Sequence, residues 1–294
     1  MDTWVYYLFP LFVLSGALSY CNIRWPQPAL AVFNRWLRWG LFSVTTGLLL
    51  AQYTEIGKSA WVLGLCAAAV WFMGETLYNW YFIGVVSRSD IPLFPRYESN
   101  PKAEEWPNQR RFIRLREQLR QLGFRHREAL RVSIGPGLYL RSSVFESEDG
   151  LIWVQVHLIP QRLGNFMLCF ILHSRTDQDQ LVVTDNVSVP SGCFFPESWQ
   201  VTRRPLLRSL KGLLKQHRKR LTKAPGTPLP FDASEAPSDE FNRQQRVLER
   251  LNYDAGFLLP IHMHEEFGRL TQDGRYRLWK ELWLIHYLGL SLKR

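Results

Sequence analysis

The chain has 294 residues, of which 46% are hydrophobic and 21% are charged, and its formal net charge is +10. Only seven of its 62 charged residues lie among the first 87, and a single water-soluble globule does not segregate charge in this way. Four scattered cysteines exclude a disulfide scaffold, and the apolar first third excludes a disordered chain or a simple soluble enzyme. The composition therefore predicts a membrane anchor over residues 1–87, followed by a domain in water.

Three apolar segments near the N-terminus are predicted to be transmembrane helices. The first, 3–23, carries no charge and is long enough to cross about 30 Å of hydrocarbon. The second, 37–56, has a shorter uncharged centre that begins after Arg38, and the third, 59–86, is interrupted only by Glu75. The short link between the second and third segments predicts an antiparallel hairpin. The first segment lacks the basic start and the cleavage site of a signal peptide, so we expect an uncleaved anchor.

The placement of arginine predicts the orientation of these helices. The loop after the first predicted helix contains Arg24, Arg35 and Arg38 without an acidic residue, whereas the next loop has no net charge. Because positively charged loops stay in the cytoplasm, we expect the N-terminus outside and residues 88–294 in the cytoplasm. The sequence thus predicts a multi-pass integral membrane protein with a large cytoplasmic domain.

Glu75 and Asn79 are the polar residues that we expect within the membrane. A carboxylate inside a span is energetically costly, and Asn79 lies one helical turn further along the same face. One interpretation is a proton or cation relay. The interpretation that we favour is a hydrogen-bonded carboxyl group that holds the helices together or reaches the inner interface, because three spans with one acid make a poor transporter.

A stripe of small residues lies on the third apolar segment. Ala60, Gly64 and Ala68 recur at four-residue spacing, which permits another helix to approach closely. The partner helix could belong to the same chain or to a second copy, and we favour the same chain.

The region after the anchor predicts an α+β domain. Residues 88–104 contain three prolines and form a juxtamembrane linker, and residues 105–223 form the domain itself. Within it, a helix over 105–123 precedes an antiparallel meander of about five strands, and a second helix follows over 205–221. This order predicts helices that flank the sheet.

Two further segments complete the chain. Residues 224–238 contain four prolines and predict a linker, and residues 239–294 predict a C-terminal helical segment. The expected fold class is therefore a membrane α-helical protein with three transmembrane helices and a cytoplasmic α+β domain, in which an antiparallel meander sheet is flanked by helices.

The helix predicted over 205–221 combines a leucine face, which we expect in the core, with dense positive charge. Residues 203–223 contain nine lysines or arginines and no acid, and residues 110–131 add eight basic residues against two acids. Under a membrane anchor, such charge suits anionic headgroups, at about 1 kcal/mol for each nearby residue. The residues that we expect at the membrane surface are Arg208, Lys211, Lys215, Arg218 and Lys219.

Nucleic acid is the other polyanion to consider. The sequence contains no zinc motif, aromatic strand signature or convincing helix-turn-helix pattern. Because the positive-inside bias already explains a basic juxtamembrane region, we do not expect nucleic acid as a partner.

A compact cluster near the C-terminus supports an alternative function. His262, His264 and Glu265 are residue types that bind zinc or iron, so a membrane-bound metal-dependent hydrolase would use this region. Two histidines two residues apart share a face on a strand but not on a helix, and the sequence places no third ligand. A polar helix start or a loop after Pro260 is the plainer interpretation.

The sequence contains no nucleotide-binding loop, nucleophile elbow or cofactor fingerprint, so we expect no cofactor and lean away from an enzyme. The function that we favour is a membrane-anchored cytoplasmic interaction or scaffold protein, which contacts the inner leaflet and binds a protein partner. The alternatives are the metal-dependent hydrolase at His262 and His264 and, less favoured, a proton-linked transport component that uses Glu75.

Overall fold

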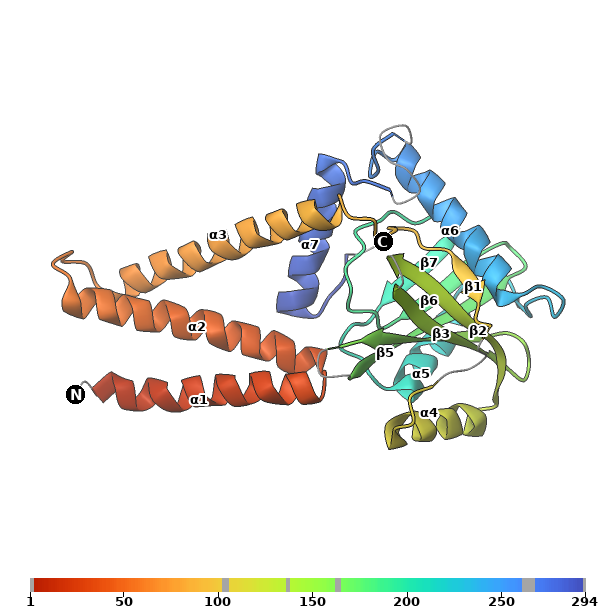
Figure 1. Cartoon of the computed structure of the whole chain (residues 1–294), viewed down its shortest axis with the longest axis horizontal. Coiled ribbons are helices and arrows are strands. Elements are labelled where there is room, and N and C mark those ends of the chain that lie inside the picture. Colours follow the sequence, from red (N-terminus) through yellow and green to blue (C-terminus); the bar gives the residue numbers. More distant parts are fainter. Residues whose placement is uncertain (1–2, 102–105, 136–137, 162–164, 261–267, 293–294) are drawn as a thin grey trace.

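The computed structural model describes residues 3–101, 106–135, 138–161, 165–260 and 268–292. Three long helices precede the domain: α1 (Thr3–Arg24), α2 (Pro28–Tyr53) and α3 (Ala60–Val86). They extend away from the domain in the same general direction, and α3 diverges from α1 (Figure 1). Helix α2 lies between the other two and contacts both.

Two of these helices, α1 and α3, are long and apolar enough to cross a membrane. Helix α2 is more polar, because it begins at Pro28 rather than at residue 37 and so includes Arg35 as well as Arg38 in its first half. Proline suits the first position of a helix, because the N–H group that proline lacks would have no hydrogen-bond partner within the helix there. Arg35, which lies outside the expected span 37–56, therefore lies on a helix.

Gly47 allows α2 and α3 to pack closely. A Cβ atom at Gly47 would lie 2.5 Å from the carbonyl oxygen of Ala60 and 2.8 Å from the Cα atom of Gly64. The indole nitrogen of Trp39 on α2 donates a hydrogen bond to the carbonyl oxygen of Ala68 at 3.1 Å. The stripe of small residues on α3 thus faces α2 of the same chain, as favoured from the sequence.

We expect Gly47→Ala to destabilise the helix pair by about 1–3 kcal/mol, because the added methyl group would meet backbone atoms. The thermal unfolding midpoint of the full-length protein in detergent measures this effect. Gly40→Ala is the matched control on the same helix, since no atom lies within 4 Å of a Cβ atom built at Gly40. Equal midpoints for the two variants would contradict the close approach.

The domain is built on a curved sheet in the strand order β1-β2-β3-β4-β5-β6-β7, and β8 pairs with β5. The strands are β1 (Tyr97–Ser99), β2 (Phe124–Gly135), β3 (Leu138–Ser147), β4 (Trp153–Pro160), β5 (Phe166–Thr176), β6 (Leu181–Asp185), β7 (Trp199–Arg203) and β8 (Pro228–Leu229). Neighbouring strands are antiparallel except for β6 and β7, which are parallel. The predicted α+β domain with a mostly antiparallel sheet is confirmed.

Two segments that we expected to be linkers also contribute strands. Residues 88–104 contain β1, and residues 224–238 contain β8. Both strands are very short, and prolines precede or begin them. Proline cannot donate a ladder hydrogen bond, so it is confined to such marginal positions of a sheet, where strands are difficult to recognise from sequence.

Helices α4 (Arg110–Gln121) and α5 (Leu210–Leu221) cover one face of the sheet. Val154 and Val156 of β4 are buried against the leucines of these helices. On α5, the buried leucines are Leu210, Leu213, Leu214 and Leu221. The leucine face therefore belongs to the core, as expected.

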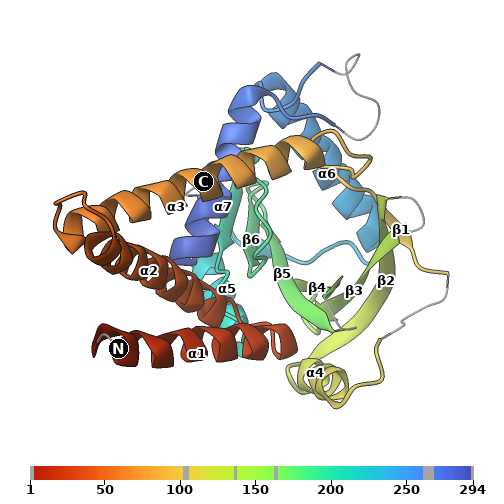
Figure 2. The ribbon, with the colours of Figure 1, turned by 60° about the vertical axis from the view of Figure 1, so that its left-hand side comes forward.

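The opposite face of the sheet is surrounded by the chain after α3 and by α6 (Pro237–Asp254) and α7 (Gln272–Leu288) (Figure 2). Side chains alternate along a strand. Gln155 and His157 of β4 therefore point to this face, while Val154 and Val156 point to the core beneath α4 and α5. Both residues are buried.

Helix α7 joins the domain to the anchor. It crosses the domain-proximal ends of α2 and α3 at a steep angle and contacts both (Figure 1). The indole nitrogen of Trp36 donates a hydrogen bond to the carbonyl oxygen of Tyr287 at 2.6 Å. The rings of Trp36 and Trp39 pack edge-on against that of Tyr287.

Candidate functional site

One end of the sheet lies next to the anchor. The side-chain amide of Asn165, in the β4–β5 connection, donates a hydrogen bond to the carbonyl oxygen of Ile23 at the end of α1, at 3.3 Å. The start of β3 lies at the same end, because Arg141 pairs with Leu158. There the structure exposes Leu138, followed by Tyr139. Large exposed apolar side chains at this end suit the interface between lipid and water.

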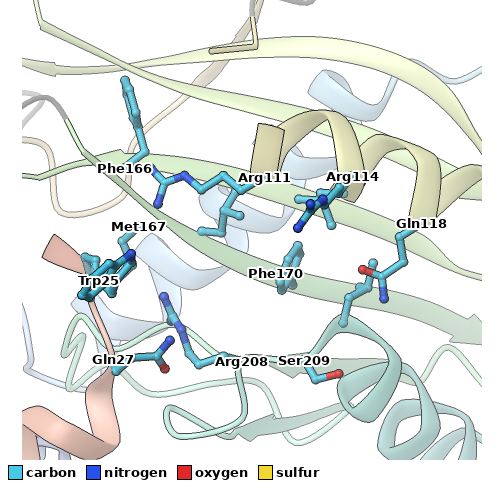
Figure 3. Close-up of a pocket in the computed structure, with 14 residues that line it drawn as sticks. Trp25, Gln27, Arg111, Arg114, Gln118, Phe166, Met167, Phe170, Arg208 and Ser209 are labelled. Carbon is cyan, nitrogen blue, oxygen red and sulfur yellow. The ribbon is translucent and has the colours of Figure 1, made fainter. Parts of the chain in front are cut away.

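A pocket of about 390 Å³ lies where the α1–α2 connection meets this end of the domain (Figure 3). Trp25 and Gln27 contribute its wall on the anchor side. Arg111 and Arg114 of α4 and Arg208, which precedes α5, contribute the domain side. We call the site lined by these residues the arginine pocket.

The arginine pocket concentrates positive charge without a compensating acid. Figure 3 shows Arg111 and Arg208 extending from opposite walls toward the region of Met167. Among the described residues that line the pocket there is no acidic side chain. The Ser209 N-cap of α5 also lines it, and a helix N-terminus carries a partial positive charge. The pocket therefore favours an anion.

Two guanidinium nitrogens in this pocket lack a partner. Nη2 of Arg111 and Nη1 of Arg208 are buried and have no hydrogen-bond acceptor in the part of the chain that the structure describes. Burial lowers the pKa of Arg111, which indicates that its charge is incompletely solvated. The guanidinium group of Arg111 lies 4.6 Å from the ring centre of Phe112. An anion with several oxygens would give both nitrogens an acceptor and would compensate the charge.

The five residues predicted at the membrane surface are spread along the depth of the domain. Arg208 lines the arginine pocket, whereas α5 continues from there toward the far end of the sheet. Arg218 interacts electrostatically with Asp149 of the β3–β4 connection at that far end. The remaining three, Lys211, Lys215 and Lys219, are exposed on the same helix. Contact of all five with lipid stays a prediction.

Glu75 connects three helices at the junction. Its carboxylate accepts hydrogen bonds from Nη1 of Arg35 on α2 and from the hydroxyl group of Tyr287 on α7. The indole nitrogen of Trp71 donates a third, at 3.3 Å. Asn79 is buried one turn further along α3. The arrangement ties the anchor to the C-terminal helix.

Asn34 is a polar residue that we did not single out from the sequence. Its side chain accepts a hydrogen bond from the hydroxyl group of Ser15 at 2.9 Å and donates one to that of Ser19 at 2.8 Å. These contacts join α1 to α2. The predicted second helix begins at residue 37, so the sequence alone places Asn34 in a loop. Its four-residue spacing from Arg38, which puts both on one face of a helix, was the pattern that could have indicated a longer helix.

The predicted metal candidates His262, His264 and Glu265 lie outside the described residues. Within the described ranges, no group of three or more histidine, cysteine, aspartate or glutamate residues could hold a metal ion.

A second cavity, of about 470 Å³, lies on the face of the sheet opposite α4 and α5. Most of its lining is aliphatic or aromatic, and Gln155, His157 and His173 are its buried polar residues of β4 and β5. Both histidines have a lowered pKa, about 4 for His157 and about 3 for His173, because burial disfavours the charged ring.

Comparison of this chain with protein-family models, with curated proteins and with solved structures finds no match. A function must therefore be inferred from the residues of the two cavities and from their position beside α1, α2 and α3.

Proposed function

We propose that this protein is a membrane-anchored cytoplasmic interaction protein whose domain binds an anionic lipid headgroup of the inner leaflet in the arginine pocket. The observation that carries the proposal is the convergence of Arg111, Arg114 and Arg208 beside Trp25. A phosphate group would supply acceptors for their buried nitrogens. Headgroup binding would hold the domain in one orientation and leave its far side accessible to a protein partner.

The proposal places α1, α2 and α3 across the bilayer, with the N-terminus outside and the domain in the cytoplasm. Arg24 at the end of α1, with Arg35 and Arg38 in the first half of α2, lies at the end of the anchor nearest the domain. The positive-inside rule favours the cytoplasm for that end. The pair between Arg35 and Glu75 supports α2 as a third span, because an intramembrane charge needs a partner.

Within this anchor we propose a structural role for Glu75 and Asn79. Arg35, Trp71 and Tyr287 all direct donors at the carboxylate of Glu75, which favours a link between helices over an open proton path.

We expect Arg111→Gln combined with Arg208→Gln to weaken headgroup binding about a hundredfold or more, because two charge-assisted hydrogen bonds are lost and each is worth about 1.5–3 kcal/mol. The measurement is amide hydrogen exchange of α4 and of residues 206–212, in the full-length protein in nanodiscs of phosphatidylcholine with increasing phosphatidylglycerol. The wild type should become protected as phosphatidylglycerol increases, and the double variant should not. Added salt should weaken the protection.

Lys215→Gln combined with Lys219→Gln is the matched control, since it removes the same charge from exposed positions of α5 outside the pocket. Protection that survives in the arginine variant, or that is lost equally in the lysine control, would contradict the pocket as the headgroup site. Inorganic phosphate is added to phosphatidylcholine nanodiscs in a separate arm. If inorganic phosphate protects these segments as well as phosphatidylglycerol does, the pocket is an anion site but the proposal that its ligand is a lipid headgroup is overturned.

A further inference from the structure

The larger cavity opens beside the anchor. Two of the described residues that line it are exposed, Ile91 by 43% and Val189 by 51%, and they mark its mouth. Ile91 closely follows α3. The hydroxyl group of Ser188, next to Val189, lies 3.6 Å from Sδ of Met167, which also lines the arginine pocket. The mouth thus lies at the end of the domain that faces the membrane.

Uncharged polar side chains line the deep part of the cavity, and the paired Asp185 and Arg203 lie nearer the mouth, beside Val187 and Val189. Ile134, Ile159 and Val187 lie near the mouth, at the anchor-proximal ends of their strands or just beyond. Ile159 and Gln155 are four positions apart on β4, a distance of about 13 Å, and His157 lies between them. His173 on β5 pairs with Trp153 on β4. It therefore lies six positions deeper along the strands than Ile159, a distance of about 20 Å.

A cluster of aromatic rings lies next to the deep end. The rings of Trp153 and Phe231 stack with their centres 3.9 Å apart, and Phe241 lies edge-on to Trp153 at 6.0 Å. Phe241 also contacts the ring of His173, with centres 5.0 Å apart. Aromatic rings therefore border the deep part of this chamber, which contains His173.

Four nitrogen atoms of these deep polar groups lack partners, although the Gln155 side chain also hydrogen-bonds to Tyr97. Nε2 of Gln155, Nδ1 of His157 and both ring nitrogens of His173 have no hydrogen bond to any described residue. The three residues are 1%, 6% and 6% exposed. Leaving several buried donors and acceptors unsatisfied in one chamber is unusual and costly, and it points to a ligand that pairs with them.

The chamber offers no free charge. Burial keeps both histidines neutral at pH 7 by lowering their pKa. The charged residues that line it, Arg203 and Asp185, pair with each other at 2.9 Å, and Arg203 also lies 3.5 Å from Glu281. The polar end of a ligand should therefore be uncharged, since an unpaired ion would be poorly stabilised here.

We propose that this cavity binds a single-chain lipid with an uncharged, hydroxyl-bearing head, of the monoacylglycerol type, taken from the adjoining leaflet. The head would reach Gln155, His157 and His173, and the hydrocarbon chain would lie against the aliphatic side chains that lead to the mouth. A volume of about 470 Å³ is in the range of pockets for one small molecule and is too small for a two-chain phospholipid. The proposal shares the membrane anchor with the proposed function but does not involve the arginine pocket.

The test uses the full-length protein in nanodiscs that contain a monoacylglycerol with a photoactivatable diazirine in its chain. After irradiation, mass spectrometry should map adducts to residues of β4, β5 and β7 that line the cavity. Unlabelled 1-monooleoylglycerol should compete at least tenfold better than oleate, which has the same chain and a charged head. Adducts confined to α1, α2 and α3, or equal competition by oleate, would overturn the proposal.

Ile171→Trp fills the cavity and should lower labelling about tenfold, whereas Ile113→Trp, at an exposed position of α4, should not. Gln155→Leu combined with His173→Leu keeps the chamber but removes hydrogen-bonding groups, and it should reduce competition by 1-monooleoylglycerol about tenfold. This second variant tests the proposal if the tryptophan variant fails to fold. The double glutamine variant of Arg111 and Arg208 should label normally, which separates this site from the headgroup site.

Discussion

Replacement of Glu75 by leucine is expected to detach α7 from the anchor and to lower the free energy of unfolding by about 3 kcal/mol. The variant leaves Arg35 without its counter-ion and removes the acceptor for Tyr287 and Trp71. The Arg35 side chain is 32% exposed, so the cost should lie at the lower end of the range for buried pairs. Thermal unfolding in nanodiscs, with limited proteolysis at the ends of α7, measures both effects.

Two further variants separate the contributions. Glu75→Gln keeps an acceptor for Tyr287 and should have an intermediate effect, and the double variant Arg35→Leu with Glu75→Leu should recover part of the loss because no unpaired charge remains. An unchanged midpoint for Glu75→Leu would contradict the structural role. A pH-dependent ion flux that Glu75→Gln abolishes, with assembly intact, would favour the relay instead.

Acid should destabilise the domain strongly between pH 6.5 and about 4. Burial lowers the pKa of His157 to about 4 and those of His173 and His217 to about 3, and Arg220 contributes at His217. The unfolded chain binds these protons near pH 6.5, whereas the folded chain does not until its own lower pKa is reached. Unfolding therefore takes up protons in this interval. At pH 5 each histidine should lower the stability by about 2 kcal/mol, or about 6 kcal/mol together.

Thermal unfolding of the full-length protein at pH 7 and pH 5 checks this prediction. His173→Leu should reduce the loss of stability between pH 7 and pH 5 by the contribution of one histidine. It should not lower the stability at pH 7, because the ring nitrogens of His173 have no described partner. His217→Leu should also reduce it but should lower stability at pH 7, since it breaks hydrogen bonds of 2.9 Å to Ser174 and to Thr184. A stability that does not change from pH 7 to pH 5 would contradict the buried neutral state of these rings.

Local periodicity in the sequence was sufficient to identify the helices and most strands. The leucines of α5 recur at three- and four-residue spacing, and their burial against the sheet follows from that pattern. The limits of α2 were less predictable, because Arg35 and Arg38 suggest a loop unless their partners are known. The pair that Arg35 forms with Glu75, 40 positions later, is a tertiary contact.

The two cavities could not be derived from the sequence, because they depend on contacts between distant segments. Arg111 and Arg208 are far apart along the chain, and they meet only because α4 and α5 cover the same face of the sheet. His157 and His173 share a face because of the β4–β5 register. One local signal existed: Gln155 and His157 alternate with valines in an otherwise apolar strand, which indicates a second, polar-lined interior.

The return of α7 to the anchor has a consequence for biosynthesis. Tyr287 completes the Glu75 site, yet it lies 212 positions after Glu75 in the chain. The junction can therefore form only after the whole intervening domain has been synthesised. A product that ends before residue 272 would lack the whole of α7 and would leave Glu75 without the hydroxyl donor of Tyr287.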